Sequence, residues 1–404
     1  MIILVFNCGS SSLKYQVLDM KGGDDCALLA KGIVERIGLE TGEITHKPSG
    51  KEKFETSRPV ADHTEGIKAV LDLLTDPRYG VLESLDRIDA VGHRVAHGGE
   101  MFPESRLIDS GVEAGIEKLC DLAPLHNPAN LLGIRAVRKL LPEVPQVAVF
   151  DTSFHQTIPD FAYMYAIPYE YYEKYGARRY GFHGTSHKFV ARKACEILGR
   201  DISETKIITC HLGNGGSVTA VMGGRSVDTS MGFTPTEGVI MGTRCGNVDP
   251  GLLTYLAEKE NLDVDGMNRL INKKSGFLGV SGVSSDCRDI TAAEENGNYR
   301  AGLSLKMFAH SVRKYIGAYS AVMGGVDLIV FTGGIGENDA PLRESICANL
   351  GYLGVDFDCG TNAGVRGSDA VITRPGSRVA VMVVATNEEL VIAQDTMSIV
   401  LGNK

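Results

Sequence analysis

The chain alternates short apolar runs with glycine-rich polar turns, and two of these segments have the same order of features. Residues 2–19 (IILVFNCGSSSLKYQVLD) form an apolar run, a small Gly/Ser turn and a second run that ends in Asp19. Residues 206–228 (KIITCHLGNGGSVTAVMGGRSVD) repeat this order and end in Asp228. Apolar runs bounded by turn residues predict β-strands, and their recurrence half a chain apart predicts a duplicated α/β domain.

The glycine turns are candidates for phosphate binding, because glycine leaves consecutive backbone N–H groups open to an anion. An ordinary hairpin is the alternative, and neither turn has the GxxxxGK[ST] pattern or leads directly into a helix. A third element, residues 327–338 (DLIVFTGGIGEN), is an apolar run that ends in glycines. Strands of α/β proteins end in this way beside a ligand, although a tight strand-to-helix connection has the same pattern. Together the turns predict a nucleotide held in a cleft between two domains.

Arginines and a carboxylate accompany these runs. Arg94 lies in the run DAVGHRVAHGGE (89–100) among small apolar neighbours, where an arginine needs an anionic partner. Arg244 lies in a glycine-rich loop (238–251), and Asp151 follows the apolar run 147–150. Phosphoryl transfer requires this set of cations, carboxylates and phosphate-binding turns. No GxSxG nucleophile elbow of a hydrolase is present.

The run VAVMVVATNEEL (379–390) predicts a buried strand followed by a helix. Thr386 and Glu389 fit a helix capping box. That interpretation accounts for Glu389 and leaves Glu388 free to bind a metal ion.

Seven of the ten histidines lie between positions 93 and 211, most of them beside turns or strand ends. Loop ends on a rigid scaffold are where catalytic groups are placed. His183 and His187 have the spacing of two metal ligands on a helix. Nothing in the sequence completes such a site, and we do not expect zinc. The seven are His93, His97, His126, His155, His183, His187 and His211.

Length and composition restrict the class of protein. A chain of 404 residues exceeds one ordinary core and predicts two or three domains. A net charge of −9 without a basic cluster argues against nucleic acid or a membrane surface as partner. The N-terminus lacks the basic region of a signal peptide, and the longest apolar run (379–385) is far shorter than the roughly 20 residues of a membrane span. Nine scattered cysteines without C-x-x-C spacing fit free thiols. We therefore predict a cytoplasmic, multi-domain enzyme.

Ten motifs, in their order along the chain, resemble those of the acetate kinase family, and the resemblance extends from residue 2 to about 395. It implies the α/β fold of the superfamily that also contains sugar kinases, heat-shock chaperones and actin, with two ribonuclease-H-like domains around an ATP cleft. The implied domains are 1–151 and 152–388, with a C-terminal helix at 389–404 that packs back on the first. The motifs are NCGSSSLKY, GHRVAHGG, APLHNP, FDTSFHQTIP, YGFHGTSH, HLGNGGS, DTSMGFTP, MGTRCG, FTGGIGEN and TNEEL.

The resemblance also implies a role for each matching residue in the reversible, direct in-line transfer of a phosphoryl group between ATP and a short-chain carboxylate. Asp151 is the catalytic acid/base or orienting carboxylate, and His183 and Arg244 stabilise the transferring group. Arg94 binds the carboxylate or acyl phosphate, and Asn7 and Glu388 bind Mg²⁺, for which Mn²⁺ could substitute. The residues implied to bind ATP are Lys14, His211, Leu212, Gly213, Asn214, Gly215, Asp286, Cys287, Arg288, Gly334, Ile335, Gly336, Glu337 and Asn338.

Some positions depart from the family's usual residues. The resemblance implies that Ala96, Leu125 and Pro235 form the pocket for the substrate methyl group. Acetate kinases commonly have valine at the position of Ala96, whereas propionate kinases of the family resemble this chain in having alanine. A methylene is worth roughly 1–3 kcal/mol in such a pocket, so Ala96 could admit propionate without excluding acetate. Thr236 replaces a common leucine, and Cys287 stands where an aromatic residue often lines the adenine site.

Three alternatives to acetate kinase activity remain. One is a kinase for propionate or a broader range of short-chain carboxylates. The others are an ATPase like actin or the chaperones, whose output is conformational, and a metal-dependent hydrolase built on the histidines. The family resemblance further implies a homodimer.

Overall fold

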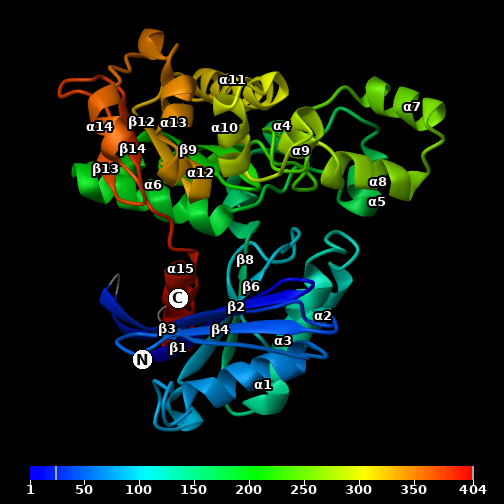
Figure 1. Cartoon of the computed structure of the whole chain (residues 1–404), viewed down its shortest axis with the longest axis vertical. Coiled ribbons are helices and arrows are strands. Elements are labelled where there is room, and N and C mark those ends of the chain that lie inside the picture. Colours follow the sequence, from blue (N-terminus) through cyan, green and yellow to red (C-terminus); the bar gives the residue numbers. More distant parts are fainter. Residues whose placement is uncertain (23–24, 403–404) are drawn as a thin grey trace. The chain divides into compact units, whose positions relative to one another are not determined.

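The computed structural model describes residues 1–22 and 25–402, and the chain divides into two compact units (Figure 1). Unit 1 is Met1–Ser153 with Asn387–Lys404, and unit 2 is Phe154–Thr386. The final helix, α15 (Glu388–Val400), therefore belongs to unit 1 although it follows unit 2 in the sequence. Among the described residues, none of the helices combines the length and the apolar character that crossing a membrane requires.

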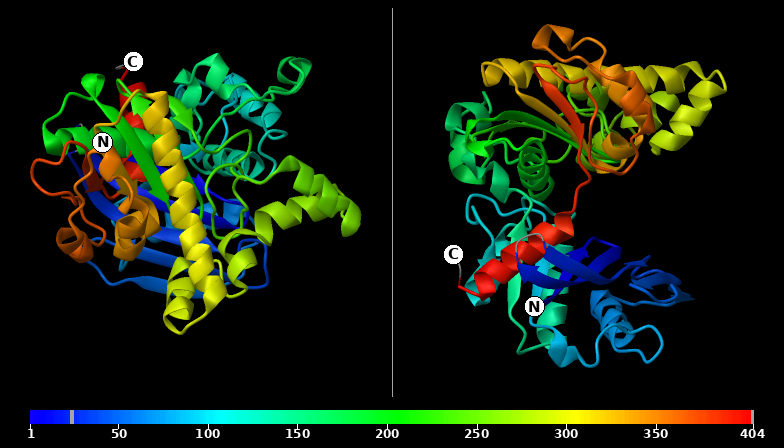
Figure 2. Two further views of the ribbon diagram at one scale, coloured as in Figure 1. Left: turned by 90° about the horizontal axis from the view of Figure 1, so that it is seen from above. Right: turned by 90° about the vertical axis from the view of Figure 1, so that its left-hand side faces the viewer.

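Unit 1 is built on a mixed sheet in the order β5-β4-β3-β2-β1-β6-β8-β7. Helices lie on both of its faces. Figure 2 shows α15 covering one of these faces. Val91 of β6 packs in the cluster that contains Val137 of α3, whereas the next residue, Gly92, faces Ile392 of α15. A Cβ atom at Gly92 would lie 2.6 Å from Ile392, so this close approach of helix and strand needs glycine. The elements are β1 (Ile2–Cys8), β2 (Ser12–Gly22), β3 (Asp25–Glu35), β4 (Gly42–Pro48), β5 (Phe54–Arg58), α1 (His63–Leu74), η1 (Leu85–Arg87), β6 (Ala90–Val95), β7 (Arg106–Leu107), α2 (Ser110–Lys118), α3 (Asn127–Leu140) and β8 (Gln146–Phe150).

Unit 2 is built on a mixed sheet in the order β11-β10-β9-β12-β14-β13. The long helix α11 packs on the face that carries Ile208 and Cys210 of β9, and α6 contacts the other face, where it meets Thr209. The strands are β9 (Lys206–Leu212), β10 (Gly216–Met222), β11 (Arg225–Thr229), β12 (Leu328–Thr332), β13 (Ala370–Val371) and β14 (Ala380–Val383). The helices are η2 (Ser153–Thr157), α4 (Asp160–Tyr163), α5 (Glu170–Tyr175), α6 (Gly184–Leu198), η3 (Ile202–Glu204), α7 (Pro250–Lys259), α8 (Val264–Lys273), α9 (Gly276–Ser281), α10 (Cys287–Glu295), α11 (Tyr299–Val322), α12 (Gly333–Asn338), α13 (Ala340–Cys347), η4 (Gly351–Leu353) and α14 (Cys359–Gly364).

The two sheets share one topology. In unit 1, β3, β2 and β1 are antiparallel neighbours, and β6 and β8 continue the sheet parallel to β1. In unit 2, β11, β10 and β9 are antiparallel neighbours, and β12 and β14 continue the sheet parallel to β9. The duplicated α/β domain predicted from the two glycine turns is confirmed by these pairings.

The central parallel strands are buried along their length, which explains their unbroken apolar sequences. Every residue of β8 (QVAVF) and of β12 (LIVFT) is buried. Parallel strands with helices on both faces have no solvent side, so they lack the alternation of polar and apolar residues seen in half-exposed strands. In β8 and β12 the polar side chains, Gln146 and Thr332, lie at a strand end, and the predicted site residues Asp151 and 334–338 follow these strands.

The start of α15 differs from the predicted capping box. The N-cap is Asn387, whose side-chain oxygen accepts from the backbone N–H of Leu390 at 3.1 Å. The Thr386 hydroxyl instead lies 2.9 Å from the Ser186 hydroxyl. Asparagine is the better N-cap residue, and Glu388 and Glu389 both lie in the first turn that follows it. The capping-box interpretation of Thr386 and Glu389 is therefore wrong.

All nine cysteines lie in the described part of the chain, and none of them is joined in a disulfide there. This confirms the prediction made from their spacing.

Candidate active site

In unit 1, Arg94 and Asp151 meet at the carboxyl ends of two neighbouring parallel strands. Arg94 is near the end of β6, and Asp151 is the first residue after β8. The Arg94 Nη2 donates to Asp151 Oδ2 at 2.7 Å. The Asp151 side chain is fully buried, while the Arg94 side chain keeps 20% of its surface exposed. The carboxyl edge of a parallel sheet is where α/β proteins bind ligands, so the pair presents a partly open guanidinium at a functional position.

Asn7 and Glu388 lie near the same pair. Asn7 lies near the end of β1, and its Oδ1 accepts from Arg94 Nη1 at 3.4 Å. Burial and the negative charge of Asp151 raise the pKa of Glu388 to about 7, against the opposing effects of Arg94 and Lys14. Although burial alone would lower it, the pKa of Arg94 is raised, because Asp151 and Glu388 stabilise its charge. Lys14 is exposed on β2, directly opposite Asn7 in the strand pair.

These residues fit a magnesium ion. Mg²⁺ binds oxygen ligands, commonly one or two from the protein with the rest from water and phosphate. The amide oxygen of Asn7 and the carboxylate of Glu388 are such ligands. Burial is the largest cause of the raised pKa of Glu388, and a cation beside this carboxylate would favour its ionised form. In residues 1–22 and 25–402, no cluster of three or more His, Cys, Asp or Glu side chains is arranged to hold a metal ion, so the described chain offers no complete protein cage.

The segment after Arg94 is held by two buried asparagines that the sequence interpretation did not single out. The side chain of Asn130 accepts from the Ala96 N–H at 2.9 Å and donates to the Cys8 carbonyl at 2.7 Å. Asn127 accepts from the His97 N–H and donates to the His97 carbonyl, both at 3.0 Å. Both asparagines are on α3. In the sequence, only their position in and just after the motif APLHNP could have indicated this role.

Of the three residues implied to form the methyl pocket, only Ala96 is fully enclosed. It is buried, Leu125 is 64% exposed, and Pro235 in unit 2 is half-buried. The Ala96 N–H is fixed by Asn130, so the backbone at this position is well defined.

In unit 2, the glycine turn between β9 and β10 lies beside His183 and Arg244. The Gly213 N–H donates to the Gly215 carbonyl at 3.0 Å and closes the turn. A Cβ atom at Gly215 would stand 3.5 Å from Arg244 Nη1 and 3.7 Å from His183 Cε1. The Asn214 carbonyl accepts from the Gly242 N–H at 2.9 Å, which ties the turn to the loop that carries Arg244. His211 and Leu212 complete the segment as the last residues of β9.

Arg244 lacks a counter-charge of its own. Within the described residues no carboxylate lies within ion-pair distance of its guanidinium, and its only hydrogen bond there is a long one, 3.9 Å, to the sulfur of Met241. Burial lowers the pKa of Arg244. A partly buried cation with this environment favours an anionic ligand.

His183 has an unusual backbone and stands in a cluster of imidazoles. Its φ is 55°, in the left-handed region, at the N-cap of α6. A non-glycine residue there stores strain, and such strain collects at functional sites. Its ring stacks on that of His211 at a centroid distance of 4.2 Å. His183 Nδ1 lies 2.9 Å from the Ser217 hydroxyl. His187 Nε2 lies 2.7 Å from the same hydroxyl, so the two imidazoles share Ser217 as a partner.

The residues implied to hold adenosine have structural contacts in unit 2. Asp286 caps α10 and pairs with Arg288 through Nη2 at 2.6 Å, and the Arg288 hydrogen bonds lower the pKa of Asp286 to about 2. The Cys287 side chain packs in the core of unit 2, where burial raises its pKa to about 12.

The glycine segment after β12 forms the short helix α12. Gly333 has a φ of 77°, and its N–H donates to Glu337 Oε1 at 2.9 Å. Asn338 Nδ2 donates to the Gly334 carbonyl at 2.9 Å. Gly334 and Asn338 are exposed, Ile335 and Glu337 are half-buried, and Gly336 is buried. The predicted strand that ends in glycines is confirmed, and it continues directly into a helix.

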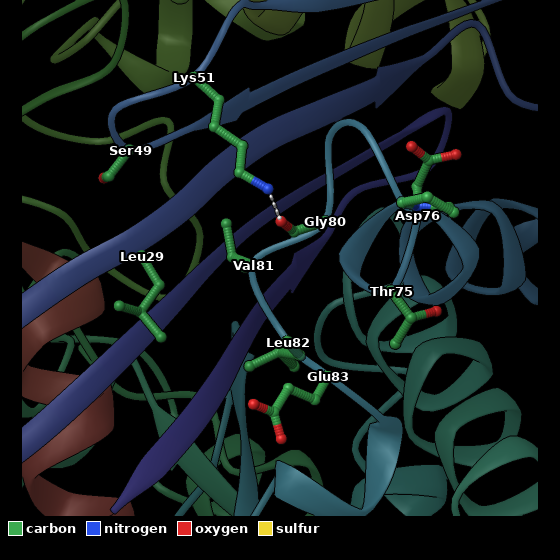
Figure 3. Close-up of a pocket in the computed structure, with 10 residues that line it drawn as sticks. Leu29, Ser49, Lys51, Thr75, Asp76, Gly80, Val81, Leu82 and Glu83 are labelled. Carbon is green, nitrogen blue, oxygen red and sulfur yellow. Dashed lines mark hydrogen bonds between the residues drawn. The ribbon is translucent and has the colours of Figure 1, made fainter.

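A separate cavity of about 580 Å³ lies in unit 1, away from the predicted residues. It is bounded by the end of β4 and the loop after α1, where Lys51 Nζ donates to the Gly80 carbonyl at 2.5 Å (Figure 3). None of the residues predicted to be functional lines it. The candidate site is therefore not this cavity.

The fold and the site together define a phosphotransferase of the α/β class. The features that do so are two units with one sheet topology, a glycine turn beside an arginine, and a carboxylate–arginine pair at a strand edge. Comparison with known proteins agrees. Residues 2–394 match the acetokinase family. The chain is 57% identical over 405 residues to the acetate kinase of Thermoanaerobacter pseudethanolicus, covering 100% of both.

Solved structures give the same result. The acetate kinase of Porphyromonas gingivalis is 51% identical, with a TM-score of 0.95 and 99% of each chain covered. A propionate kinase from Francisella tularensis is 40% identical, with a TM-score of 0.91 over 98% of this chain and 99% of its own. The chain belongs to the acetokinase family, and it is a phosphotransferase with the fold of these enzymes.

Proposed function

We propose that this protein catalyses the reversible, Mg²⁺-dependent transfer of the γ-phosphoryl group of ATP to acetate, giving acetyl phosphate and ADP. The observation that carries the proposal is the position of Arg244, a partly buried guanidinium without a described carboxylate partner, beside Gly215 and His183. In phosphoryl transfer the developing negative charge is spread over the equatorial oxygens, and cations and N–H donors placed around it supply most of the catalysis.

The nucleotide phosphates are proposed to bind at the turn Leu212–Gly215 in unit 2. The turn presents backbone N–H groups without obstructing side chains. Arg244 and His183 then contact the group in transfer. Adenosine is proposed to lie against Asp286–Arg288 and Gly334–Asn338. Because the Cys287 side chain is buried in the core, the backbone and the neighbouring side chains would make the contacts with adenosine.

The acceptor is proposed to bind through Arg94 in unit 1, whose partly exposed guanidinium can form a second, bidentate pair with a carboxylate. A simple carboxylic acid has a pKa of about 4 and is ionised at neutral pH, so the acceptor needs no general base. The contacts of Asp151 support an orienting role: it holds the Arg94 fork at 2.7 Å. Transfer is therefore proposed to be direct, without a covalent phosphoenzyme.

Asn7 and Glu388 are proposed to hold the magnesium ion, with Mn²⁺ as a substitute. When bound, the ion would neutralise phosphate charge. Lys14, exposed opposite Asn7 on the neighbouring strand, adds a positive charge for ATP.

A hydroxamate trap for acyl phosphate tests the activity. Purified protein is incubated with ATP, Mg²⁺, hydroxylamine and acetate, propionate or butyrate, and kcat/KM is compared among the acids. We expect acetyl hydroxamate at the highest kcat/KM. Absence of hydroxamate with all three acids would refute a carboxylate kinase.

A propionate or broader short-chain carboxylate kinase is the second candidate, and Ala96 favours it. The residue is buried and small, and its backbone is fixed by Asn130. A higher kcat/KM for propionate than for acetate would establish this candidate in place of the first.

We also propose a homodimer. Phe161, Ile167 and Tyr169, in and beside α4 and α5, are more than half exposed, and a group of exposed apolar side chains is typical of an interface. Analytical ultracentrifugation of the full chain tests this, and a single species of 43.4 kDa at micromolar concentration would contradict it.

A further inference from the structure

A continuous chain of hydrogen bonds runs from the middle of β9 to His183. The Thr209 hydroxyl lies 2.7 Å from His187 Nδ1. His187 Nε2 lies 2.7 Å from the Ser217 hydroxyl, and that hydroxyl lies 2.9 Å from His183 Nδ1. Thr209, Ser217 and His187 are fully buried. The chain therefore consists of two hydroxyls and two imidazoles in alternation, with its far end shielded from water.

Counting protons gives this chain a direction. A buried hydroxyl normally donates its hydrogen, because an unpaired donor is costly. In the described part of unit 2, the only side-chain contact of the Thr209 hydroxyl is His187 Nδ1. Thr209 is therefore the donor and His187 Nδ1 the acceptor.

The same direction of donation continues through the His187 ring. Burial, with smaller effects of His155 and His211, lowers its pKa well below the usual range, so the ring is neutral and carries one N–H. Since Nδ1 accepts, the proton is on Nε2, which donates to the Ser217 hydroxyl. Across residues 1–22 and 25–402, that hydroxyl has one other contact, His183 Nδ1, to which it donates.

The end of the chain is the proposed phosphoryl site. If His183 Nδ1 accepts, the proton of a neutral His183 ring is on Nε2. A Cβ atom at Gly215 would stand 3.8 Å from that nitrogen, so Nε2 lies beside the glycine turn. We propose that Ser217, backed by His187 and Thr209, is a positioning residue that fixes His183 as the Nε2–H tautomer and so directs an N–H donor at the transferring phosphoryl group. The role of this N–H donor in phosphoryl transfer rests on the proposed function, whereas the tautomer of His183 does not.

Three other basic side chains of unit 2 lie near His183 or His187. His211 stacks on it at 4.2 Å, and its Nδ1 lies 2.8 Å from the Ser186 hydroxyl. Arg244 faces the same turn, and His155 lies 5.8 Å from the His187 ring. An imidazolium at His183 would add a positive charge next to Arg244, whereas the neutral Nε2–H form donates without it.

Nitrogen NMR of the full chain with labelled histidine tests the tautomer directly, because protonated and unprotonated ring nitrogens resonate at different shifts. A His183→Gln sample assigns the His183 signals by their loss. We expect Nε2 to be protonated and Nδ1 unprotonated at neutral pH in the wild-type protein. An Nδ1–H tautomer or an imidazolium at His183 would overturn the proposal, whatever the outcome of the hydroxamate assay.

A matched pair of substitutions at Thr209 tests the direction. Thr209→Val removes the first donor and keeps the shape, so His187 can place its proton on Nδ1 and the chain reverses toward His183. Thr209→Ser keeps the hydroxyl. We expect Nδ1–H signals at His183 and a fall in kcat of about 10-fold or more in the valine variant only, with the KM for ATP and acetate little changed. Equal His183 spectra and equal kcat in the two variants would refute the chain.

Ser217→Ala removes the link next to His183, and Thr219→Val is its control. Thr219 is also a buried hydroxyl on β10, but it bonds to Thr229 and not to a histidine. We expect kcat to fall about 10- to 100-fold in Ser217→Ala, with a changed pH profile of kcat, and to stay within about twofold in Thr219→Val. A loss of kcat in both variants that follows their unfolding midpoints would show a structural role only and would overturn the proposal. If wild-type protein makes no acyl phosphate but shows the expected tautomer, the proposed function fails and the positioning chain stands.

Discussion

Arg94 donates to Asp151 at 2.7 Å across the edge where β6 and β8 end side by side. The carboxylate is fully buried and the guanidinium is partly exposed. Asp151 therefore fixes the guanidinium on one side, and the exposed side can bind an anionic ligand. The sequence predicted an anionic partner for Arg94 but suggested the substrate as that partner. The structure adds a resident carboxylate that fixes the guanidinium before any ligand binds.

Arg94→Ala is expected to lower kcat/KM for the carboxylate by about 10³-fold or more while the protein stays folded, because a placed guanidinium is typically worth that much in phosphoryl transfer. Arg94→Lys is expected to restore only a small part, since an ammonium lacks the planar fork that can hold Asp151 and a second carboxylate together. Steady-state kinetics and circular dichroism check both variants. Near-normal turnover in Arg94→Ala would contradict the assignment.

Arg244→Ala is expected to lower kcat by about 10³–10⁵-fold with a smaller change in the KM for acetate, because its guanidinium is proposed to contact the group in transfer. Arg374→Ala is the matched control: this arginine is also in unit 2, but it is exposed and paired with Asp356. The control should keep full activity. Similar losses in both variants would point to a general effect on unit 2.

Ala96→Val is expected to lower kcat/KM for propionate relative to acetate by about 10-fold, within the range that one methyl group is worth in an apolar pocket. Ala96 is buried and its N–H is held by Asn130, so the backbone cannot easily move to make room. The ratio of the two kcat/KM values is the measurement, and it needs no correction for stability. An unchanged ratio would show that the acid is selected elsewhere.

Glu388→Gln is expected to raise the Mg²⁺ concentration needed for half-maximal activity by about 10-fold or more, because the amide offers a neutral oxygen in place of a carboxylate. Glu389→Gln, one residue further along the first turn of α15, is the control and should change it little. Titration of activity with Mg²⁺ after EDTA treatment and dialysis gives both values. If the two variants respond equally, Glu388 is not the ligand.

His93 makes the stability of the protein depend on pH. It is buried on β6, where burial lowers its pKa from 6.5 to about 4, and its Nε2 lies 2.8 Å from the side-chain amide of Gln146. A group whose pKa is lowered by folding contributes stability above its unfolded pKa and loses it as the pH falls. The free energy of unfolding should therefore decline by roughly 3 kcal/mol from this group between pH 6.5 and 4, at about 1.4 kcal/mol per pKa unit.

Urea denaturation at a series of pH values checks this, with His93→Asn as the comparison. The variant should be less stable at pH 7.5 and should show a shallower decline toward pH 4. Parallel curves for the two proteins would mean that other groups cause the acid sensitivity.

Local pattern was enough to predict the two strand–turn–strand units, because apolar runs and glycine turns are determined by neighbours in the sequence. It was also enough to single out Arg94 and Asp151 as candidates, because charged side chains at the ends of buried strands stand out from the runs before them, and Arg244, because it lies in a glycine-rich loop. The cap of α15 was wrong because Thr386 and Asn387 both suit an N-cap, and only the contact of Thr386 with Ser186 decides between them.

What the sequence determined by itself is the fold class, the duplication and the kind of chemistry. These follow from hydrophobic periodicity, turn residues and side-chain type. What only the tertiary structure decided is which groups share a hydrogen bond. Arg94 and Asp151 are 57 residues apart, Asn130 and Cys8 are 122 apart, and His187 and Ser217 are 30 apart. Such pairs depend on strand order and register, which bring distant residues together and leave no local signal in the chain.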